Sequence, residues 1–544
     1  MIHRSPLEDV QIPDTPLTDH VLELAGGLGA KPALIDGPTG RTLTYRQLEH
    51  DIRGLATGLM ETGFGKGDVL AVVSPNLPEY AVAFHAAALA GGTITTVNPV
   101  YTAREMHDQL ISAGASVLVV APAFESTAAA AAVGTAVRRT YLLGPVDPGT
   151  PPGTPRLADL IRDRPAVQVP VDPDDVVALP YSSGTTGGAK GVMLTHRNLV
   201  ANIAQVIAPS RMRGDETVIA VLPFFHIYGM QVVMNCGLRV GATVITMPRF
   251  DLAEYLRIHA EHGVTRSFVA PPIVLALAKH PMVDQYDLSA LETVFSGAAP
   301  LSAELALAAG RRLSCEVVQG YGMTELSPVS HTTPPGGFVP GSVGVALART
   351  ECRIVDPVTG QDLPADQDGE IWIRGPQVMK GYLNDEQATR RTLDDEGWLH
   401  TGDLGHVAPN GHLFVVDRLK ELIKVSGFQV APAELEALLL THPGVSDAAV
   451  VGRPDPEHGE MPCGFVVRRP GATVSAAELL EFVAGQVAGY KRLRQVGFVE
   501  AIPRSAAGKI LRRMLTEDPT GPARPTDAPG TGAATEQAGQ AQPA

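Results

Sequence analysis

Short apolar runs alternate with longer stretches of helical spacing from about residue 33 to residue 145. Residues 69–73 and 93–97 are compact β-like runs, and residues 78–89 form a helical stretch that begins with proline. An earlier helix is predicted by an apolar stripe preceded by a capping box: Leu48, Ile52, Leu55 and Leu59, with Thr44 and Gln47. Such alternation is typical of parallel sheets covered by helices.

The alternation continues over residues 217–270, and the pattern then changes. From about residue 340 to residue 416 the apolar runs are short and turns are frequent, which predicts a small β-barrel-like subdomain. We therefore predict an α/β fold: a large N-terminal domain of helix-covered, mostly parallel sheets over 1–419, and a small α+β domain over 420–515. Residues 516–544, rich in Pro, Gly, Ala and Thr, are expected to be a disordered tail.

Composition and net charge argue against several classes of protein. A net charge of −15 gives no electrostatic footprint for nucleic acid. The four cysteines are far apart and predict neither a disulfide framework nor a zinc site. We find no apolar signal segment and no run of 18 uncharged apolar residues, so we expect a cytoplasmic protein without integral membrane association. The oligomeric state stays open.

A glycine-rich stretch, Tyr181–Gly191, follows an apolar run and contains four glycines, two serines, two threonines and one lysine. Glycines let backbone N–H groups approach a ligand, and hydroxyls and an ammonium add donors for phosphate oxygens. The stretch therefore predicts a loop that binds a polyphosphate, although an ordinary surface loop has a similar composition. It is not the common P-loop, because Ala189 precedes Lys190 and Gly191 follows it.

Five motifs in order resemble the adenylate-forming superfamily of acyl-CoA synthetases, luciferases and peptide-synthetase adenylation domains. They are Ser182–Gly187 with Lys190-Gly191, Gly320–Glu325, Thr401–Asp403, Asp417–Lys424 and Pro503–Lys509. The resemblance covers the chain up to about Arg513. Residues 225–229 and 427–434 are most similar to the 4-coumarate–CoA ligase branch.

The resemblance implies an ATP- and Mg²⁺-dependent acid–CoA ligase that forms an acyl-AMP and then an acyl-CoA thioester. The expected substrate is a small carboxylic acid of the 4-coumarate or cinnamate type. The nucleotide and coenzyme A contacts implied are Ser182, Ser183, Gly184, Thr185, Thr186, Gly187, Lys190, Gly320, Tyr321, Gly322, Thr324, Asp403, Arg418, Lys424, Gly427, Gln429 and Lys509. Glu325 is the implied magnesium ligand.

The catalytic residues implied are Lys509, His226, Lys424 and Thr324, and the acyl pocket comprises His226, Tyr228, Val232, Ala298, Gly320, Pro328 and Val329. Without the resemblance, a lone histidine among apolar residues would more often be a core residue, and the charged groups would be solvated surface groups. Relatives rotate their small domain about the position of Lys420 between the two half-reactions. One face then presents Lys509, and the other brings Lys424 and Gln429 to coenzyme A.

Two departures from the family pattern lie in loops. Ala189 stands where most relatives have proline, and Val425-Ser426 stands where the plant branch has Tyr-Lys.

Three alternative functions remain: a medium-chain fatty acyl-CoA ligase, a luciferase-like oxygenase that uses the same acyl-AMP, and a carrier-loading module or catalytically inactive binder. No carrier-protein segment follows the small domain, and Lys190, Glu325, Asp403 and Lys509 are all present, which disfavours the third.

Overall fold

The structure is a computed structural model that describes residues 1–145, 155–163, 169–182, 189–426, 428–505 and 508–516. Contacts divide the chain into two units. The first contains Met1–Glu421 together with Arg504–Lys509, and the second contains Leu422–Pro503 and the chain from Ile510 onward. The predicted α/β class is confirmed by three sheets and their covering helices in the first unit. The predicted tail, residues 516–544, lies outside the described residues except for Thr516, which ends the helix Arg512–Thr516.

One sheet of the first unit has seven strands in the order β19-β9-β8-β5-β4-β6-β7. Neighbours from β8 to β7 are parallel, and β9 and β19 are antiparallel to their neighbours. The strands are β4 Val69–Val73, β5 Thr93–Val97, β6 Ala115–Val120, β7 Arg139–Leu142, β8 Val176–Ser182, β9 Lys190–Thr195 and β19 Gly381–Tyr382.

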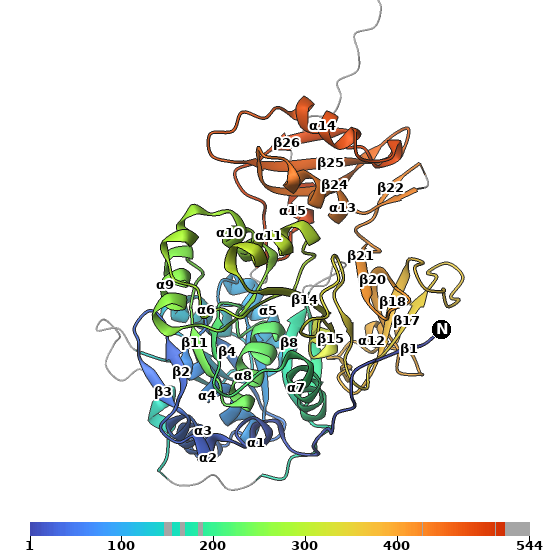
Figure 1. The fold of residues 1–544 in the computed structure, drawn as a ribbon. Coiled ribbons are helices and arrows are strands. Elements are labelled where there is room, and N and C mark those ends of the chain that lie inside the picture. The colour runs from blue at the N-terminus through green and yellow to red at the C-terminus, as the bar shows by residue number, and fades with distance from the viewer. Residues whose placement is uncertain (146–154, 164–168, 183–188, 427, 506–507, 517–544) are drawn as a thin grey trace, which may run out of the picture. The chain divides into compact units, whose positions relative to one another are not determined.

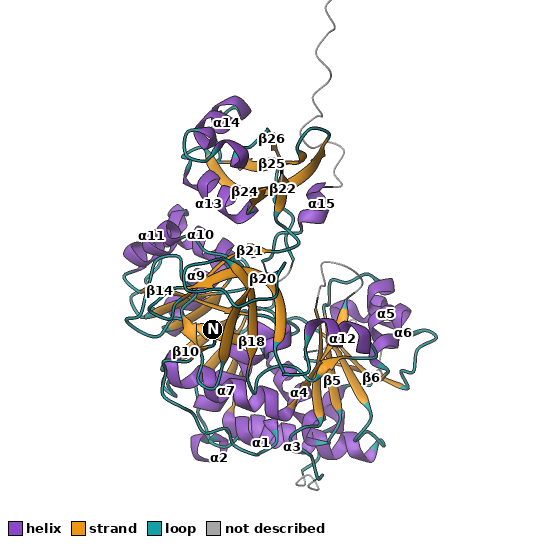
Figure 2. Ribbon diagram, turned by 90° about the vertical axis from the view of Figure 1, so that its right-hand side faces the viewer, coloured by secondary structure: helices purple, strands orange, loops and turns teal. Residues whose placement is uncertain are grey.

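Both faces of this sheet are covered, as Figure 2 shows. In β4, Val69, Ala71 and Val73 share a core with helices α5 (Ala103–Ala113) and α6 (Glu125–Ala132). Leu70 and Val72 belong to the core that contains α3 (Tyr45–Glu61) and α4 (Pro78–Leu89). Successive side chains of a strand point to opposite faces of the sheet, so a continuous apolar run predicts a strand that is covered on both sides. The capping box of Thr44 and Gln47 at the start of α3 is confirmed.

The second sheet of this unit has nine strands in the order β16-β15-β14-β13-β12-β10-β11-β2-β3. From β14 to β2 the neighbours are parallel, as predicted. The strands are β2 Pro32–Asp36, β3 Thr42–Thr44, β10 Thr217–Ala220, β11 Thr243–Thr246, β12 Arg266–Val269, β13 Thr293–Ser296, β14 Glu316–Gly322, β15 Val329–Thr332 and β16 Val345–Ala346.

The helices of the first unit lie between and around these sheets (Figure 1). They are α1 Leu17–Val21, α2 Ala25–Leu28, α3 Tyr45–Glu61, α4 Pro78–Leu89, α5 Ala103–Ala113, α6 Glu125–Ala132, α7 His196–Ser210, α8 Cys236–Val240, α9 Leu252–His262, α10 Pro271–Lys279, α11 Ala303–Leu313 and α12 Glu386–Thr392. A π-helix spans Tyr228–Asn235. Within the described ranges, no helix is both long enough and apolar enough to cross a membrane.

The predicted β-rich region forms a third, antiparallel sheet in the order β1-β17-β18-β20-β21. Its strands are β1 His3–Arg4, β17 Glu351–Val355, β18 Gly369–Arg374, β20 Leu399–Val407 and β21 Leu413–Arg418. The edge strand β1 comes from the N-terminus and pairs with β17 through His3 and Cys352. Two polar residues carry no strand pattern, so the sequence does not predict this pairing.

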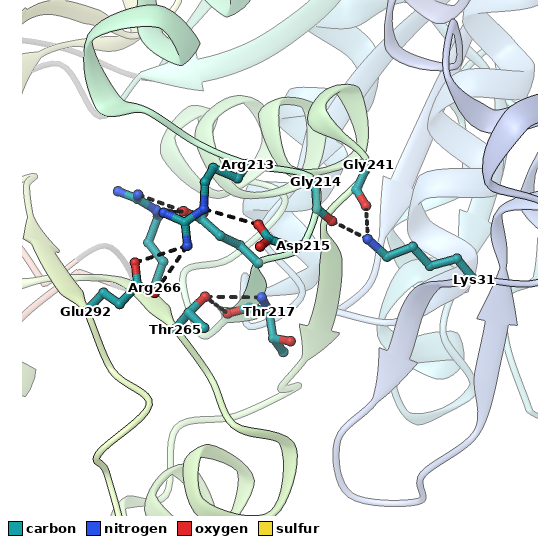
Figure 3. Close-up of polar contacts among 10 residues, drawn as sticks. Lys31, Arg213, Gly214, Asp215, Thr217, Gly241, Thr265, Arg266 and Glu292 are labelled. Carbon is teal, nitrogen blue, oxygen red and sulfur yellow. Dashed lines mark hydrogen bonds and ion pairs between the residues drawn. The ribbon is translucent and has the colours of Figure 1, made fainter.

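Buried charge fixes the end of the nine-stranded sheet at which strands β10 and β12 begin (Figure 3). Arg266 donates two hydrogen bonds of 2.9 Å to the carboxylate of Glu216, and both side chains are buried. Lys31 donates to the carbonyl oxygen of Gly241 at 2.6 Å and joins the loop after α8 to the start of β2. Breaking a buried ion pair costs about 3–5 kcal/mol. The pair therefore stabilises the end of the sheet at which β10 and β12 begin. Three residues of the candidate site, His226, Ala298 and Glu325, follow the opposite, carboxyl ends of β10, β13 and β14.

The second unit is an α+β domain with two small cores. Its sheet has the order β23-β22-β25-β24, and β26 pairs in parallel with β25. The strands are β22 Ile423–Val425, β23 Phe428–Val430, β24 Val445–Asp455, β25 Gly459–Arg468 and β26 Gln495–Phe498, and the helices are α13 Pro432–Thr441, α14 Ala476–Ala484 and α15 Arg512–Thr516. The sequence predicts a domain boundary between residues 419 and 420, which stays a prediction. The contacts divide the chain after Glu421.

Candidate active site

The glycine-rich stretch joins two strands of one hairpin. Ser182 at the end of β8 lies opposite Lys190 at the start of β9. The predicted phosphate contacts Ser183, Gly184, Thr185, Thr186 and Gly187 lie outside the described residues. A Cβ at Gly191 would lie 3.1 Å from the ring of Tyr181, so this position leaves little room for a larger side chain. Ser182 and Lys190 are therefore placed at the strand ends that flank the loop.

Lys190 faces an aromatic ring and, beyond it, the predicted magnesium ligand. The Lys190 ammonium nitrogen lies 5.0 Å from the centroid of the Tyr382 ring. The Tyr382 hydroxyl donates a hydrogen bond of 2.8 Å to Oε1 of Glu325. Sequence reasoning missed Tyr382, because Gly381-Tyr382 lies outside the five motifs and two residues carry no spacing signal.

A second cluster surrounds Asp403. Its Oδ2 accepts a hydrogen bond of 2.7 Å from the hydroxyl of Tyr321, and its Oδ1 lies 3.3 Å from Nε of Arg418. Asp403 and Arg418 are paired residues on β20 and β21, whereas Tyr321 comes from β14. Burial, and secondarily the charge of Asp403, raises the pKa of Tyr321. The structure thus brings together three residues that the sequence assigned to the nucleotide.

The turn around Tyr321 leaves no room for side chains on either side of the ring. A Cβ at Gly320 would lie 2.7 Å from the ring of Phe295, and one at Gly322 would lie 2.0 Å from the carbonyl oxygen of Pro328. Only glycine permits such an approach. Thr324 then opens the short 3₁₀ turn Thr324–Leu326, which carries the buried Glu325.

Tyr228, one of the predicted acyl-pocket residues, packs against residues at and after the ends of β12 and β13. Its buried hydroxyl donates to the carbonyl oxygen of Phe295 at 3.3 Å, and its ring meets Phe268 edge-on at a centroid distance of 6.3 Å. A Cβ at Gly297 would lie 2.8 Å from the Tyr228 ring, so Gly297 is in close contact with it. Ala298 follows with a positive φ of 72°, which alanine rarely adopts.

Other predicted pocket residues come from two separate segments. Val232 is buried in the π-helix that contains Tyr228. Val329, at 9% exposed, begins β15, and Pro328 precedes it. Neighbouring strands β13, β14 and β15 therefore position most of the predicted pocket.

His226 is the predicted catalytic residue of this pocket. Its Nδ1 accepts a hydrogen bond of 3.3 Å from the backbone N–H of Tyr228, so the neutral ring carries its proton on Nε2. Burial, and secondarily the positive charge of Lys509, lowers the pKa of His226 to about 4. The ring is therefore neutral near pH 7 and can donate one hydrogen bond from Nε2.

Lys509 lies in the short segment Arg504–Lys509 that groups with the first unit. Its backbone N–H donates to the Ser505 hydroxyl at 3.2 Å. Burial and the charge of Arg418 lower the pKa of Lys509, while the carboxylates of Asp403 and Glu325 oppose that shift. The lysine therefore shares an electrostatic environment with both polar clusters described above.

The predicted coenzyme A contacts lie in the second unit. Lys424 and Gln429 are both exposed and face each other on β22 and β23. Gly427 lies outside the described residues. Ser426 has a positive φ of 49°, and its N–H donates to the carbonyl oxygen of His458 at 2.7 Å. Lys420, the predicted hinge, lies two residues before the start of this unit.

Comparisons with known proteins identify relatives along almost the whole chain. A family model described as AMP-binding enzyme matches residues 23–383, and one described as AMP-binding enzyme C-terminal domain matches residues 434–509. The 4-coumarate–CoA ligase 1 of Solanum tuberosum is 45% identical over 528 residues, which cover 95% of this chain and 96% of that protein. The 4-coumarate–CoA ligase 2 of Petroselinum crispum is also 45% identical, with the same coverage of both chains.

Solved structures show the same fold. ATP-bound MatB from Rhodopseudomonas palustris superimposes with a TM-score of 0.83 at 30% identity and covers 92% of this chain and 99% of its own. The anthranilate CoA ligase AuaEII in complex with anthranoyl-AMP gives a TM-score of 0.85 at 26% identity, over 94% of this chain and 97% of its own.

Proposed function

Because this chain belongs to the AMP-binding enzyme family, we propose that it is an AMP-forming acid–CoA ligase acting on 4-coumarate-type aromatic acids. One observation carries this proposal: the plant 4-coumarate–CoA ligases match it at 45% identity from near one end of both proteins to the other. ATP and coenzyme A are its co-substrates. We further propose that it works in the cytoplasm, where both are available.

In the first half-reaction a carboxylate oxygen of the acid attacks the α-phosphorus of ATP, and pyrophosphate leaves. Negative charge develops on the phosphate oxygens, so fixed positive groups lower the barrier. Lys190, at the end of the glycine loop, supports the β- and γ-phosphates in this proposal. Lys509 supports the α-phosphate and the reacting carboxylate, and its position near Glu325 and Asp403 favours that role.

The polar cluster around Asp403 suits the nucleoside. Each oxygen of the carboxylate already has one protein partner, Tyr321 or Arg418. A carboxylate has about four acceptor sites, so both ribose hydroxyls can still donate to it. The Tyr321 ring, between two glycines, offers a face on which adenine can stack.

Glu325 fits the role of magnesium ligand. The carboxylate is buried, and Tyr382 occupies Oε1. In the described residues, no group of three or more His, Cys, Asp or Glu side chains could hold a metal. Mg²⁺ usually takes only one or two protein carboxylates and completes its shell with phosphate oxygens and water. Bound there, the ion would neutralise phosphate charge.

In the second half-reaction the coenzyme A thiol releases its proton to water and attacks the acyl carbon of the acyl-AMP, and AMP leaves with its phosphate. A neutral His226 exerts no charge attraction, but its Nε2–H can orient the carboxyl oxygen of the acid. Tyr228 and Gly297 provide a flat apolar wall for a ring. Lys424 and Gln429 contact coenzyme A in this proposal.

Substrate-dependent AMP release with Mg-ATP and coenzyme A tests the function directly. We expect the highest kcat/KM with 4-coumarate and cinnamate among 4-coumarate, cinnamate, benzoate, octanoate and palmitate. A preference for octanoate would retain the mechanism and replace the substrate by a medium-chain fatty acid. Light emission with oxygen would instead support the luciferase-like alternative. If none of the acids caused AMP release, the proposal would be contradicted.

A further inference from the structure

We propose that Tyr382 is a positioning residue that holds the carboxylate of Glu325 and the ammonium of Lys190 apart, each directed toward its part of a metal–nucleotide complex. This inference rests on the proposed function and assigns a role to a residue outside the motifs that predicted the site. Three observations support it: the fixed backbone around Tyr382, the two contacts of its side chain, and the absence of an ion pair between the two charged groups.

The backbone of residues 379–383 is pinned on both sides of Tyr382. The N–H of Met379 donates to the carbonyl oxygen of Glu325 at 2.9 Å, and that of Leu383 donates to Gly191 at 2.8 Å. Tyr382 itself lies opposite Val192 in the β19–β9 pair. One short segment is therefore bonded to both the strand that begins with Lys190 and the turn that carries Glu325.

The position of Tyr382 is further fixed by its neighbours. Its N–H donates to the hydroxyl of Thr389 in α12 at 2.9 Å. Gly381, with a positive φ of 146°, allows the chain to approach that helix, because a Cβ there would lie 2.9 Å from the Thr389 methyl group. The backbone at Tyr382 is thus held by contacts other than those that its side chain makes in the site.

The side chain touches both charged groups through different parts. The hydroxyl donates to Oε1 of Glu325 at 2.8 Å, and the ring face lies 5.0 Å from the Lys190 ammonium. Tyr382 is 8% exposed and Glu325 is 5% exposed.

This arrangement prevents the two charges from neutralising each other. In the part of the chain that the structure describes, neither Lys190 nor Glu325 forms an ion pair with any residue. A direct Lys–Glu pair would occupy the groups that phosphate and metal need. The ring holds the cation by its face, and the phenol fixes one carboxylate oxygen and leaves Oε2 for a metal.

Two substitutions at this position separate the two contacts. Tyr382→Phe removes the hydroxyl and keeps the ring. We therefore expect the Kd of Mn²⁺, measured in the presence of a non-hydrolysable ATP analogue, to rise about tenfold. Affinity for the metal-free analogue should stay within twofold of the wild type. Tyr382→Leu removes the ring as well, and the metal-free analogue should then also bind several-fold more weakly.

Water-proton relaxation measures the bound Mn²⁺ and does not depend on turnover. The control is Tyr255→Phe, which removes another buried tyrosine hydroxyl, bonded to Ser267 at 2.5 Å, from the unrelated helix α9. This control should bind Mn²⁺ as the wild type does. Wild-type Mn²⁺ affinity in Tyr382→Phe, or equal loss in the control, would overturn the inference.

Two further checks keep the test decisive. If Tyr382→Phe does not fold, Thr389→Val removes the acceptor of the Tyr382 N–H and leaves the phenol; weaker Mn²⁺ binding supports the inference, and unchanged binding contradicts it. The proposed function fails separately, through absence of AMP release by the wild type with every acid. Mn²⁺ and nucleotide binding stay measurable in that case.

Discussion

Tyr228 shows how one side chain can serve both the fold and substrate choice. Its hydroxyl donates to the Phe295 carbonyl, so its oxygen keeps lone pairs that can accept a hydrogen bond from a substrate. A 4-coumarate phenol can supply that bond, whereas cinnamate has no hydroxyl. The residue is buried, and an unpaired polar group there would be costly.

We predict that Tyr228→Phe lowers the kcat/KM for 4-coumarate relative to cinnamate about fivefold, which corresponds to one lost hydrogen bond of about 1 kcal/mol. Steady-state AMP release with both acids measures the ratio. The activity with cinnamate should change little. Tyr255→Phe is the matched control and should leave the ratio unchanged. An unaltered ratio in Tyr228→Phe would remove this residue from the end of the pocket that meets the phenol.

At the scale of elements, the turn from β14 to β15 places Tyr321, Thr324 and Glu325. Its geometry depends on Gly322, whose Cα faces the carbonyl oxygen of Pro328. The sequence identified Gly320–Glu325 as a motif, but the motif alone does not show why residue 322 is a glycine. In the structure, the backbone just before β15 occupies the space that a side chain at residue 322 would need.

We predict that Gly322→Ala disrupts this turn, because its Cβ would lie 2.0 Å from a backbone oxygen and the backbone must shift. Acyl-AMP formation should fall at least tenfold, and the melting temperature should drop by a few degrees for about 1–3 kcal/mol of strain. Pyrophosphate release and thermal unfolding measure the two effects.

The control for that variant is Gly26→Ala in helix α2. A Cβ there meets nothing within 4 Å, so this change should be neutral or slightly stabilising. Equal activity of Gly322→Ala and Gly26→Ala would show that the turn tolerates the movement. The importance assigned to its geometry would then be wrong.

For the whole molecule, the two half-reactions are predicted to depend on different residues. Lys509 interacts electrostatically with Arg418, Asp403 and Glu325, whereas Lys424 and Gln429 belong to the second unit. We predict that Lys509→Ala abolishes acyl-AMP formation and leaves thioester formation from synthetic acyl-AMP within a few-fold of the wild type. Pyrophosphate release and acyl-CoA formation, assayed separately, distinguish the steps. Equal loss of both would contradict the assignment.

Buried histidines predict how the stability of the whole protein depends on pH. Burial lowers the pKa of six histidines to about 4 or, for one, to about 3: His20, His85, His196, His226, His259 and His331. In the unfolded chain a histidine titrates near pH 6.5. Between pH 6.5 and 4 the unfolded state therefore binds more protons, and the free energy of unfolding falls as the pH falls.

We predict that the melting temperature is nearly constant above pH 7 and drops steeply from pH 6.5 to pH 5, with roughly 1 kcal/mol lost for each buried histidine by pH 5.5. Differential scanning fluorimetry across this range measures it. His259→Gln should flatten the dependence, and His50→Gln should not, because His50 is exposed and its hydrogen bond to Asp51 raises its pKa. Identical slopes for both variants would exclude burial as the cause.

Local patterns along the chain predict much of the architecture. Continuous apolar runs such as Val69–Val73 predict strands covered on both faces, and Thr44 with Gln47 predicts where α3 begins. These patterns are local, because the period of a strand or helix is determined by neighbouring residues. The order of the five motifs likewise indicates the family, which the family models and the plant relatives support.

The tertiary structure alone decided which distant residues meet. Tyr321 and Asp403 are 82 residues apart, and Tyr382 reaches Glu325 across 57 residues, because the order of strands places their segments side by side. The same holds for β1, which joins the sheet of β17 although its two residues show no strand pattern. Strand order follows from the packing of the whole core rather than from local spacing, so the sequence determined the elements and motifs while the folded chain determined their contacts.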